Sequence, residues 1–187
     1  MLTVHDFQTQ QIAWARKNFG KAYDYQPLLG MIEELGELAH ALLKGLQGIR
    51  GTAAEHEEAG KDAVADVLVY LTQYCSEKEW ALDEIVGATT FEELQAAQKD
   101  LGFVLGQTVP PCVRLVLEAC TALGKVSAAE CNGDSQGGKL AVAGTLSKIA
   151  SYCAVRSWDL QKIVEDTWAV VSKRDWTKNR QTGQVTP

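Results

Sequence analysis

The sequence predicts an all-α protein. Its 187 residues include only four prolines, and the long segments carry strong helix formers whose apolar residues recur at helical spacing. Runs of β-branched residues, which would favour strands, are few. In addition, two stretches of the chain repeat the same pattern of residues. We therefore expect a helical bundle built from two related halves.

The expected helices follow one another along the chain and are interrupted by two glycine-containing loops. One loop contains Gly45, Gly48, Gly51 and Thr52, and the other covers residues 132–138. Glycine, asparagine and aspartate favour turns, so both segments should separate helices. We expect helices over residues 3–19, 27–46, 56–79, 110–131, 136–156 and 158–174, with a shorter one near 91–100.

The composition is ordinary for a soluble globular protein, with 46% hydrophobic and 22% charged residues. No apolar run approaches the roughly 20 residues that span a bilayer, and the first residues lack the features of a secretory signal. The five cysteines are scattered and form no Cys-x-x-Cys pair, which indicates reduced thiols in a cytoplasmic protein. The net charge of −6 argues against a nucleic-acid partner. A phosphorylated ligand would need a bound cation or a local cluster of Lys and Arg.

An internal repeat relates the two halves. Residues 63–86 and 141–164 lie 78 positions apart, and ten of the twenty-four aligned residues are identical. The shared pattern is Ala-Val-Ala, then Tyr-Cys, then Trp-x-Leu-x-x-Ile-Val. Two unrelated helical hairpins could share an apolar period but not Tyr-Cys followed by Trp, so a tandem duplication is indicated. The preceding helices align more weakly at a displacement of 84, which places Glu34 on Glu118.

Three glutamates gather on one side of the second predicted helix. Glu33 and Glu37 are four residues apart, and Glu34 and Glu37 are three apart, so the three carboxylates can converge. Like charges at this spacing repel one another unless a cation lies between them. When this helix is considered alone, a solvated acidic face is the simpler explanation.

The third predicted helix favours the cation. Asp66 has apolar or aromatic neighbours on nearly every side of the helix, and Asp62 lies one turn earlier on the same side. A carboxylate in such surroundings costs several kcal/mol unless it is paired, protonated or bound to a metal. Carboxylates on two neighbouring helices suit a hard cation, Mg²⁺ or Mn²⁺. A buried Asp held by one Lys or Arg is the alternative.

The second copy lacks most of these carboxylates. On the alignment above, its apolar framework is kept while four of the five acidic positions are lost together. Such a joint loss indicates that the acidic residues serve one site, which the second copy has given up. The aligned positions are Gly144 for Asp66, Leu140 for Asp62, Leu117 for Glu33, Thr121 for Glu37 and the retained Glu118 for Glu34.

The run Glu33-Glu34-x-x-Glu37, followed on the next helix by an acidic pair that ends in Asp66, resembles the signature of the MazG superfamily. The flanking Leu-Leu-Gly-Met, Gln-Gly-Ile-Arg and Lys-Arg-Asp-Trp segments are similar to those of bacterial and phage members. The resemblance implies an all-α fold of the MazG type. It divides the chain into a repeat with the metal and catalytic site (1–86), a linker with a short helix (87–109), and a degenerate repeat with a basic tail (110–187).

The resemblance also implies an activity, the Mg²⁺-dependent hydrolysis of an NTP or dNTP to the monophosphate and pyrophosphate, in nucleotide-pool house-cleaning. Glu33, Glu34, Glu37 and Asp66 would be catalytic, and the same four with Asp62 would be the metal ligands. The metal would orient the triphosphate and lower the pKa of a bound water, with Glu33 or Glu34 as general base. One departure matters, because the family's Glu three residues before the final Asp is Ala63 here.

Basic and aromatic residues complete the expected site. Basic groups should stabilise the leaving pyrophosphate, and an aromatic ring could stack on the base. We expect the C-terminal tail to fold back to the first-half site, a disordered basic end being the alternative. The candidates are Lys44, Arg50, Lys173, Arg174, Lys178 and Arg180 for the phosphates, and Trp14, Phe19 and Trp176 for the base.

Two other functions fit parts of the sequence. The Ala63 departure is compatible with a catalytically silent nucleotide- or metal-binding regulatory protein of the same fold. The spacing Glu37-x-x-His40 is compatible with a di-iron bundle. A di-iron site needs two such motifs, however, and neither His5 nor His56 has a Glu three residues before it. In the MazG-type interpretation the two repeats form a pseudo-dimer within one chain, and a homodimer of such chains is a further possible assembly.

Overall fold

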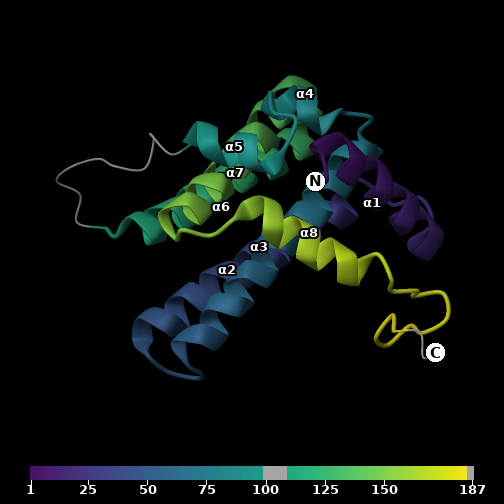
Figure 1. Ribbon diagram of the computed structural model, residues 1–187. Coiled ribbons are helices and arrows are strands. Elements are labelled where there is room, and N and C mark those ends of the chain that lie inside the picture. Colours follow the sequence, from purple (N-terminus) through teal and green to yellow (C-terminus); the bar gives the residue numbers. More distant parts are fainter. Residues whose placement is uncertain (99–108, 185–187) are drawn as a thin grey trace.

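The computed structural model describes residues 1–98 and 109–184, which form helices joined by short turns and contain no strand (Figure 1). None of the helices in these ranges combines the length and apolar character that crossing a membrane requires. The helices are α1 (Val4–Phe19), α2 (Tyr25–Gln47), α3 (Ala53–Glu77), α4 (Leu82–Val86), α5 (Phe91–Gln98), α6 (Pro111–Asn132), α7 (Ser135–Val155) and α8 (Leu160–Val171).

The all-α prediction is confirmed for the described residues, and each predicted helix has a counterpart there. The short helix α4 was not predicted, because five residues are too few to show a helical period. Gly45 lies inside α2, and α7 begins within the predicted second loop, at Ser135. Residues 99–108 of the predicted linker and 185–187 of the predicted tail lie outside the described residues.

Local side-chain chemistry fixes where the hairpin helices begin and end. Thr52 and Glu55 form a reciprocal capping box at the start of α3, and the Asp134 carboxylate accepts from the Gly137 N–H at the start of α7. Gly48 and Gly133 end α2 and α6 with φ of 63° and 67°, a conformation that glycine adopts without strain. Residues 48–52 join α2 to α3, whereas residues 133–134 join α6 to α7, so the first turn is the longer one.

Two antiparallel hairpins, α2–α3 and α6–α7, contain the longest described helices, and the tip of the first projects away from the other helices (Figure 1). They contact each other through α2 and α6, and each inserts a tryptophan into the other. A Cβ on Gly60 of α3 would lie 2.9 Å from the Trp158 ring, and a Cβ on Gly138 of α7 would lie 2.9 Å from the Trp80 ring. Both pairs of positions are 78 residues apart, so the two contacts are reciprocal.

The turns after α3 and α7 hold these tryptophans in the same way. Trp80 lies edge-on to Tyr74 at 5.8 Å, and Trp158 lies edge-on to Tyr152 at 5.5 Å between ring centroids. The backbone N–H of each tryptophan donates to the backbone carbonyl of the cysteine five residues earlier, at 2.8 Å. Two cations also lie over each ring: Lys78 and Lys139 over Trp80, and Arg156 and Lys61 over Trp158.

Helices α1 and α5 occupy matching places against these turns. The Gln8 side chain of α1 donates to the Trp80 carbonyl at 2.7 Å and accepts from the Leu82 N–H. The Gln95 side chain of α5 donates to the Trp158 carbonyl at 2.6 Å and accepts from the Leu160 N–H. Thus α5, which falls in the predicted linker, makes the contacts in one half that α1 makes in the other.

The burial pattern of α2 recurs in α6 at a displacement of 88 and not at the expected 84. A Cβ on Gly144 would lie 3.7 Å from the Ala122 side chain, so Ala122 occupies the place that Glu34 holds beside Asp66. The sequence alignment was wrong by four residues, because positions one turn apart share a helix face and carry similar residues. The matching buried pairs are Leu28 and Val116, Met31 and Ala119, Leu35 and Leu123, Leu38 and Val126, and Ala41 and Ala129.

Candidate metal centre

The predicted acidic residues lie on the facing helices of the first hairpin. Helix α2 carries exposed Glu33 and Glu37 and half-buried Glu34, and α3 carries exposed Asp62 and half-buried Asp66. The antiparallel packing of α2 against α3 brings both sets to the same stretch of the hairpin. The fold therefore juxtaposes all five carboxyl groups that the sequence nominated.

Asp66 lies at the edge of the most apolar part of α3. Its helix neighbours Ala65 and Val67 are buried in the core, whereas the Asp66 side chain reaches partly to solvent. Burial, together with the negative charges of Asp62 and Glu37, raises its pKa to about 6, while Arg174 opposes this shift. Asp66 is thus less enclosed than the sequence predicted, but its charged form is disfavoured as expected.

Glu34 shows the mutual repulsion of the cluster most clearly. Burial raises its pKa to about 7, and the charges of Asp66, Glu37, Glu33 and Asp62 add to the shift in that order. The four other acidic groups therefore all act on Glu34 through a partly desolvated space. A carboxyl group in this state gains from a neighbouring cation, which would restore its charged form.

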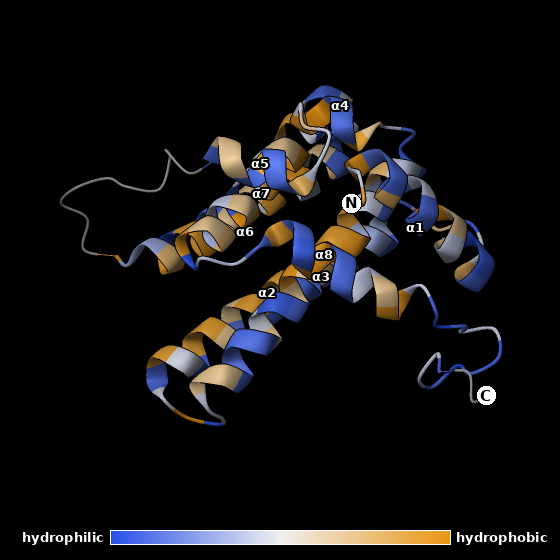
Figure 2. Cartoon of the chain, viewed as in Figure 1, coloured by the Kyte–Doolittle hydropathy of each residue, from blue (hydrophilic) through white to orange (hydrophobic). Residues whose placement is uncertain are grey.

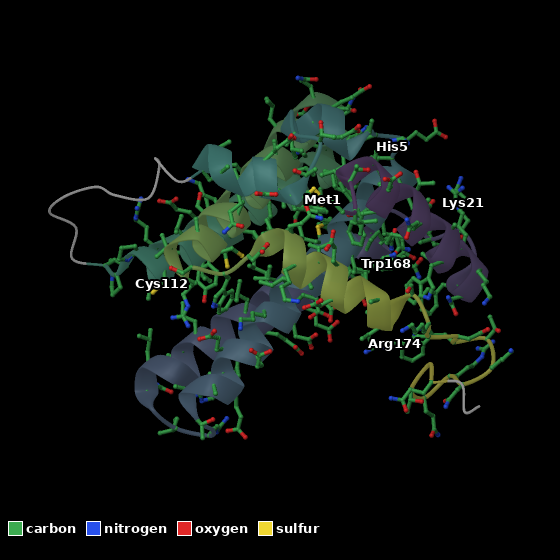
Figure 3. All side chains as sticks on the ribbon, in the orientation of Figure 1. Met1, His5, Lys21, Cys112, Trp168 and Arg174 are labelled. Carbon is green, nitrogen blue, oxygen red and sulfur yellow. The ribbon has the colours of Figure 1, made fainter. Side chains whose placement is uncertain are left out.

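Arg174 is the cation that the fold supplies. It follows α8 (Figure 3). Its positive charge opposes the rise in the pKa of Asp66. The segment after α8 is fixed on α1, since the Trp14 indole N–H donates to the Arg174 carbonyl at 3.0 Å and the Trp176 N–H donates to Asn18 at 2.7 Å. A salt bridge of 3.2 Å between Lys17 and Asp175 adds to this attachment. The tail thus folds back and brings Arg174 to the acidic cluster, whereas the side chains of Lys173 and Lys178 are exposed.

A groove of about 790 Å³ opens beside the acidic cluster, between α2 and α3. It brings Arg50, from the loop after α2, to the same space as Glu33 and Glu37. Lys44 does not line it, and its ammonium group binds Gln47 at 3.1 Å instead. His40 and His56 also line the groove, although the sequence gave them no role in the proposed chemistry. The spacing Glu37-x-x-His40, which the sequence analysis used only for the di-iron alternative, is the signal that points to His40.

Tyr70 is a second residue that the sequence analysis missed. It lies on α3 one turn after Asp66, and burial with the charges of Glu34 and Glu33 raises its pKa. A Cβ on Gly30 would come within 2.5 Å of its ring, so α2 needs a glycine to approach α3 at this point. The Gly30–Tyr70 contact therefore sets the spacing of the two helices next to the carboxylates.

The aromatic candidates for base stacking hold the tail. Trp14 lies edge-on to Trp168 at 6.0 Å and to Phe19 at 5.7 Å, and Phe19 lies 6.2 Å from Trp176. These rings bridge α1, α8 and the C-terminal segment, and only Phe19 among the candidates is exposed. Their observed contacts serve to position Arg174.

The donor chemistry of the cluster fits a hard divalent cation, but its side chains are not gathered around one point. Within residues 1–98 and 109–184, no group of three or more His, Cys, Asp or Glu side chains is close enough to hold a metal ion. The oxygen donors and the raised pKa values of Glu34 and Asp66 fit Mg²⁺. Binding of a metal ion would therefore require these side chains to rotate toward one point.

The equivalent place in the second hairpin is a groove of about 690 Å³ between α6 and α7. When α2 is aligned with α6 at 88 residues and α3 with α7 at 78 residues, none of the five acidic residues of the first hairpin, Glu34 included, has an acidic counterpart in the second. The retained Glu118 instead pairs with Arg114 and Lys148, at 3.2 and 2.8 Å. The counterparts are Thr121 for Glu33, Ala122 for Glu34, Lys125 for Glu37, Leu140 for Asp62 and Gly144 for Asp66.

Comparisons with known proteins leave the family open. No protein-family model matches the chain, and no significant match was found among curated proteins or solved structures. The fold and the site therefore define an all-α protein with an acidic centre between two helices.

Proposed function

We propose that this protein is a Mg²⁺-dependent nucleoside triphosphate pyrophosphohydrolase of the MazG type. The observation that carries the proposal is the partly buried cluster of α2 and α3 carboxylates, where burial and the neighbouring negative charges raise the pKa of Glu34 to about 7 and that of Asp66 to about 6. Such a cluster favours a divalent cation, and a cation is what an acidic protein needs to bind a triphosphate.

The exposure of each carboxyl group suggests its role in the proposed reaction. Half-buried Glu34 and Asp66, with Glu37, would hold Mg²⁺, and Asp62 is near enough to contribute to the same field. When bound, Mg²⁺ supplies Lewis acidity and positive charge for the triphosphate. The exposed carboxylate of Glu33 lines the groove, where a water molecule and a substrate can reach it.

Glu33 then acts as the general base. It accepts a proton from water as the water oxygen bonds to the α-phosphorus. The bond from that phosphorus to the bridging oxygen breaks, and the electron pair leaves with pyrophosphate. Arg50 in the groove and Arg174 beside Asp66 offset the negative charge that develops on the leaving group.

The two halves of the chain would then be a pseudo-dimer produced by tandem duplication. Supporting contacts are the reciprocal insertion of Trp80 and Trp158 and the matching roles of Gln8 and Gln95. The second half would then begin before α5, within the linker predicted for residues 87–109 and not at residue 110. One half keeps the acidic site, and the other keeps only its framework.

A silent binding protein of the same fold is the second candidate. Its support is that Ala63 is buried in the core where the family has a glutamate, and that no three described ligands are gathered together. In this case the protein would bind a nucleotide or metal ion without turnover.

One assay separates these functions. Purified protein with Mg²⁺ and a panel of NTPs and dNTPs should release pyrophosphate and the monophosphate, with no product when Asp66→Asn replaces the native chain. Binding without product by the native chain, seen by calorimetry, would support the silent protein. Release of orthophosphate and the diphosphate would contradict the assigned bond.

A further inference from the structure

In both halves of the chain, a tyrosine and a cation precede the inserted tryptophan by six and two residues. In the first half, the Tyr74 hydroxyl donates to a carboxylate oxygen of Glu130 on α6 at 2.7 Å, and the Lys78 ammonium group donates to the same oxygen at 3.1 Å. Asp24 is a second carboxylate that binds Lys78, also at 3.1 Å. The hydroxyl and the cation of the first half therefore have their acceptors within the chain.

The second half keeps these two donors, but neither acceptor has a carboxylate counterpart. The tyrosine is retained, and arginine replaces the lysine. At the displacement of 88 residues, α2 provides a leucine in place of the glutamate, and α6 provides a cysteine in place of the aspartate. A hydroxyl and a cation are thus kept where their acidic partners are lost. The counterparts are Tyr152 for Tyr74, Arg156 for Lys78, Leu42 for Glu130 and Cys112 for Asp24.

A pocket of about 190 Å³ lies at the place of the missing carboxylates. Tyr152, Arg156, Leu42 and Cys112 all line it, and Cys112 stands at the start of α6 (Figure 3). Apolar residues colour long stretches of α2, which forms one wall (Figure 2). The volume is below the roughly 300 Å³ at which pockets for drug-sized ligands begin, so the pocket suits a small group. The repeat and the cavity thus identify the same place independently.

The donors in the pocket have the chemistry to bind an anion. The Arg156 guanidinium lies 5.1 Å from the centre of the Trp158 ring, which restricts its movement. Burial raises the pKa of Tyr152 to about 12, and the positive charge of Arg156 opposes this rise, so the two groups act on each other. With this pKa the hydroxyl stays protonated at neutral pH and can donate. Arginine pairs with carboxylate and phosphate groups through two N–H groups at once.

Among the described residues that line the pocket, Glu57 is the only one with a carboxylate, and its main partner lies elsewhere. Glu57 binds the Lys61 ammonium group at 3.0 Å, whereas its nearest distance to the Arg156 guanidinium is 3.8 Å, too long for a hydrogen bond. His56 also lines the pocket, and its Nε2 lies 3.0 Å from the Ile49 carbonyl oxygen. The charges of Arg156 and Lys61 therefore outweigh that of Glu57 at this place.

From these observations we propose that the pocket binds a small oxyanion, the carboxylate or phosphate group of a ligand, between the Tyr152 hydroxyl and the Arg156 guanidinium. The ligand takes the place that Glu130 holds in the first half. It accepts one hydrogen bond from the hydroxyl and two from the guanidinium. This site is independent of the proposed catalytic activity, because none of its residues belongs to the acidic cluster of α2 and α3.

The first test is calorimetric titration of the full chain with sodium acetate and, separately, with sodium phosphate. We expect one ion per chain, and the ion that binds more tightly tells a carboxylate ligand from a phosphorylated one. Arg156→Met should raise the dissociation constant at least about 10-fold, and Tyr152→Phe about 5-fold. Tyr74→Phe, the same change at the equivalent position, should leave it within about 2-fold. No binding of either ion, or binding that Arg156→Met and Tyr152→Phe leave unchanged, overturns the proposal.

A carboxylate built into the pocket provides the second test. Leu42→Glu supplies at the equivalent position the group that Glu130 supplies in the first half, so it should weaken binding of the added ion at least about 10-fold. Leu43→Glu adds the same charge at the next residue, which is 48% exposed and does not line the pocket, and should retain binding. Unchanged binding in a folded Leu42→Glu chain contradicts the proposal. If Leu42→Glu fails to fold, Tyr152→Phe, which removes a single oxygen, decides the question.

Discussion

The hairpins α2–α3 and α6–α7 share a framework and differ in charge on one face. The reciprocal tryptophan contacts show that the two hairpins pack alike, and the buried positions of α2 and α6 match at 88 residues. On the acidic face, Glu34 and Asp66 stand where the second hairpin has Ala122 and Gly144. Packing can therefore be kept while a polar site is lost, because the framework and the site use different faces of the same helices.

The largest difference between the hairpins should appear on removal of Asp66. Asp66→Asn removes a negative charge from the cluster with little change in volume, so the fold should remain. Activity should fall by at least about 10²–10³-fold, the typical loss when one transition-state interaction is removed. The checks are the rate of pyrophosphate release and Mg²⁺ affinity by calorimetry. Retention of both in the variant would remove Asp66 from the site.

Arg174 lies in the second half of the chain, and its charge acts on Asp66 in the first half. Arg174→Ala should reduce kcat/KM by about 10-fold, the loss of one partly exposed ionic contact to phosphate. It should also raise the pKa of Asp66 further, since the arginine charge lowers it at present. Lys162→Ala on the exposed side of α8, whose side chain binds Asp166, is the control and should behave as the native chain.

Much of this comparison could be predicted from the sequence. The Tyr-Cys and Trp pattern located both hairpins, and the spacing of Glu33, Glu34 and Glu37 nominated one half of the site. Periodicity fixes which face of a helix is buried but not its register along a partner, because residues one turn apart share a face. The pairing of Glu34 with Glu118 was wrong for this reason.

Contacts between distant segments were harder to predict. Arg174 acts on Asp66 because Trp14 and Asn18 fix the tail on α1, and no local pattern encodes that attachment. Tyr70 and Gly30 form a pair only once α2 and α3 pack, so neither residue stood out in the linear sequence. The groove histidines, His40 and His56, come to line one space for the same reason.

The reciprocal tryptophan contacts should respond equally to mutation. Gly60→Ala and Gly138→Ala each place a Cβ 2.9 Å from a tryptophan ring, and each should lower the free energy of unfolding by about 1–3 kcal/mol. Gly144→Ala is the matched control, because its Cβ would lie at an ordinary 3.7 Å from Ala122 and should stabilise α7 by about 0.5–1 kcal/mol. Chemical denaturation measures all three. Markedly unequal costs at Gly60 and Gly138 would contradict the equivalence of the hairpins.

The acidic face should also make the stability of the metal-free protein depend on pH. The corresponding face of the second hairpin, which lacks these carboxylates, cannot produce this effect. Glu34 and Asp66 have pKa values raised from 4.5 to about 7 and from 3.8 to about 6. These two groups therefore bind more protons in the folded chain than in the unfolded chain between about pH 4 and 7. Their contribution to stability is largest at acidic pH and falls as the pH rises through this window. Comparing the native chain with Glu34→Gln by thermal unfolding from pH 5 to 8 isolates this slope, which the variant should reduce.

The smallest expected effect is at Thr121, the spatial counterpart of Glu33. Its hydroxyl donates to the Leu117 carbonyl within α6 at 2.9 Å and faces a groove without the carboxylates of the first hairpin. Thr121→Ala should therefore leave kcat and KM within about 2-fold of the native values, whereas Glu33→Ala should lower kcat by about 10²-fold through loss of the general base. Steady-state kinetics of the two variants compare equivalent positions directly. A large loss in Thr121→Ala would mean that the second hairpin takes part in the chemistry, and the division of function between the two hairpins would be wrong.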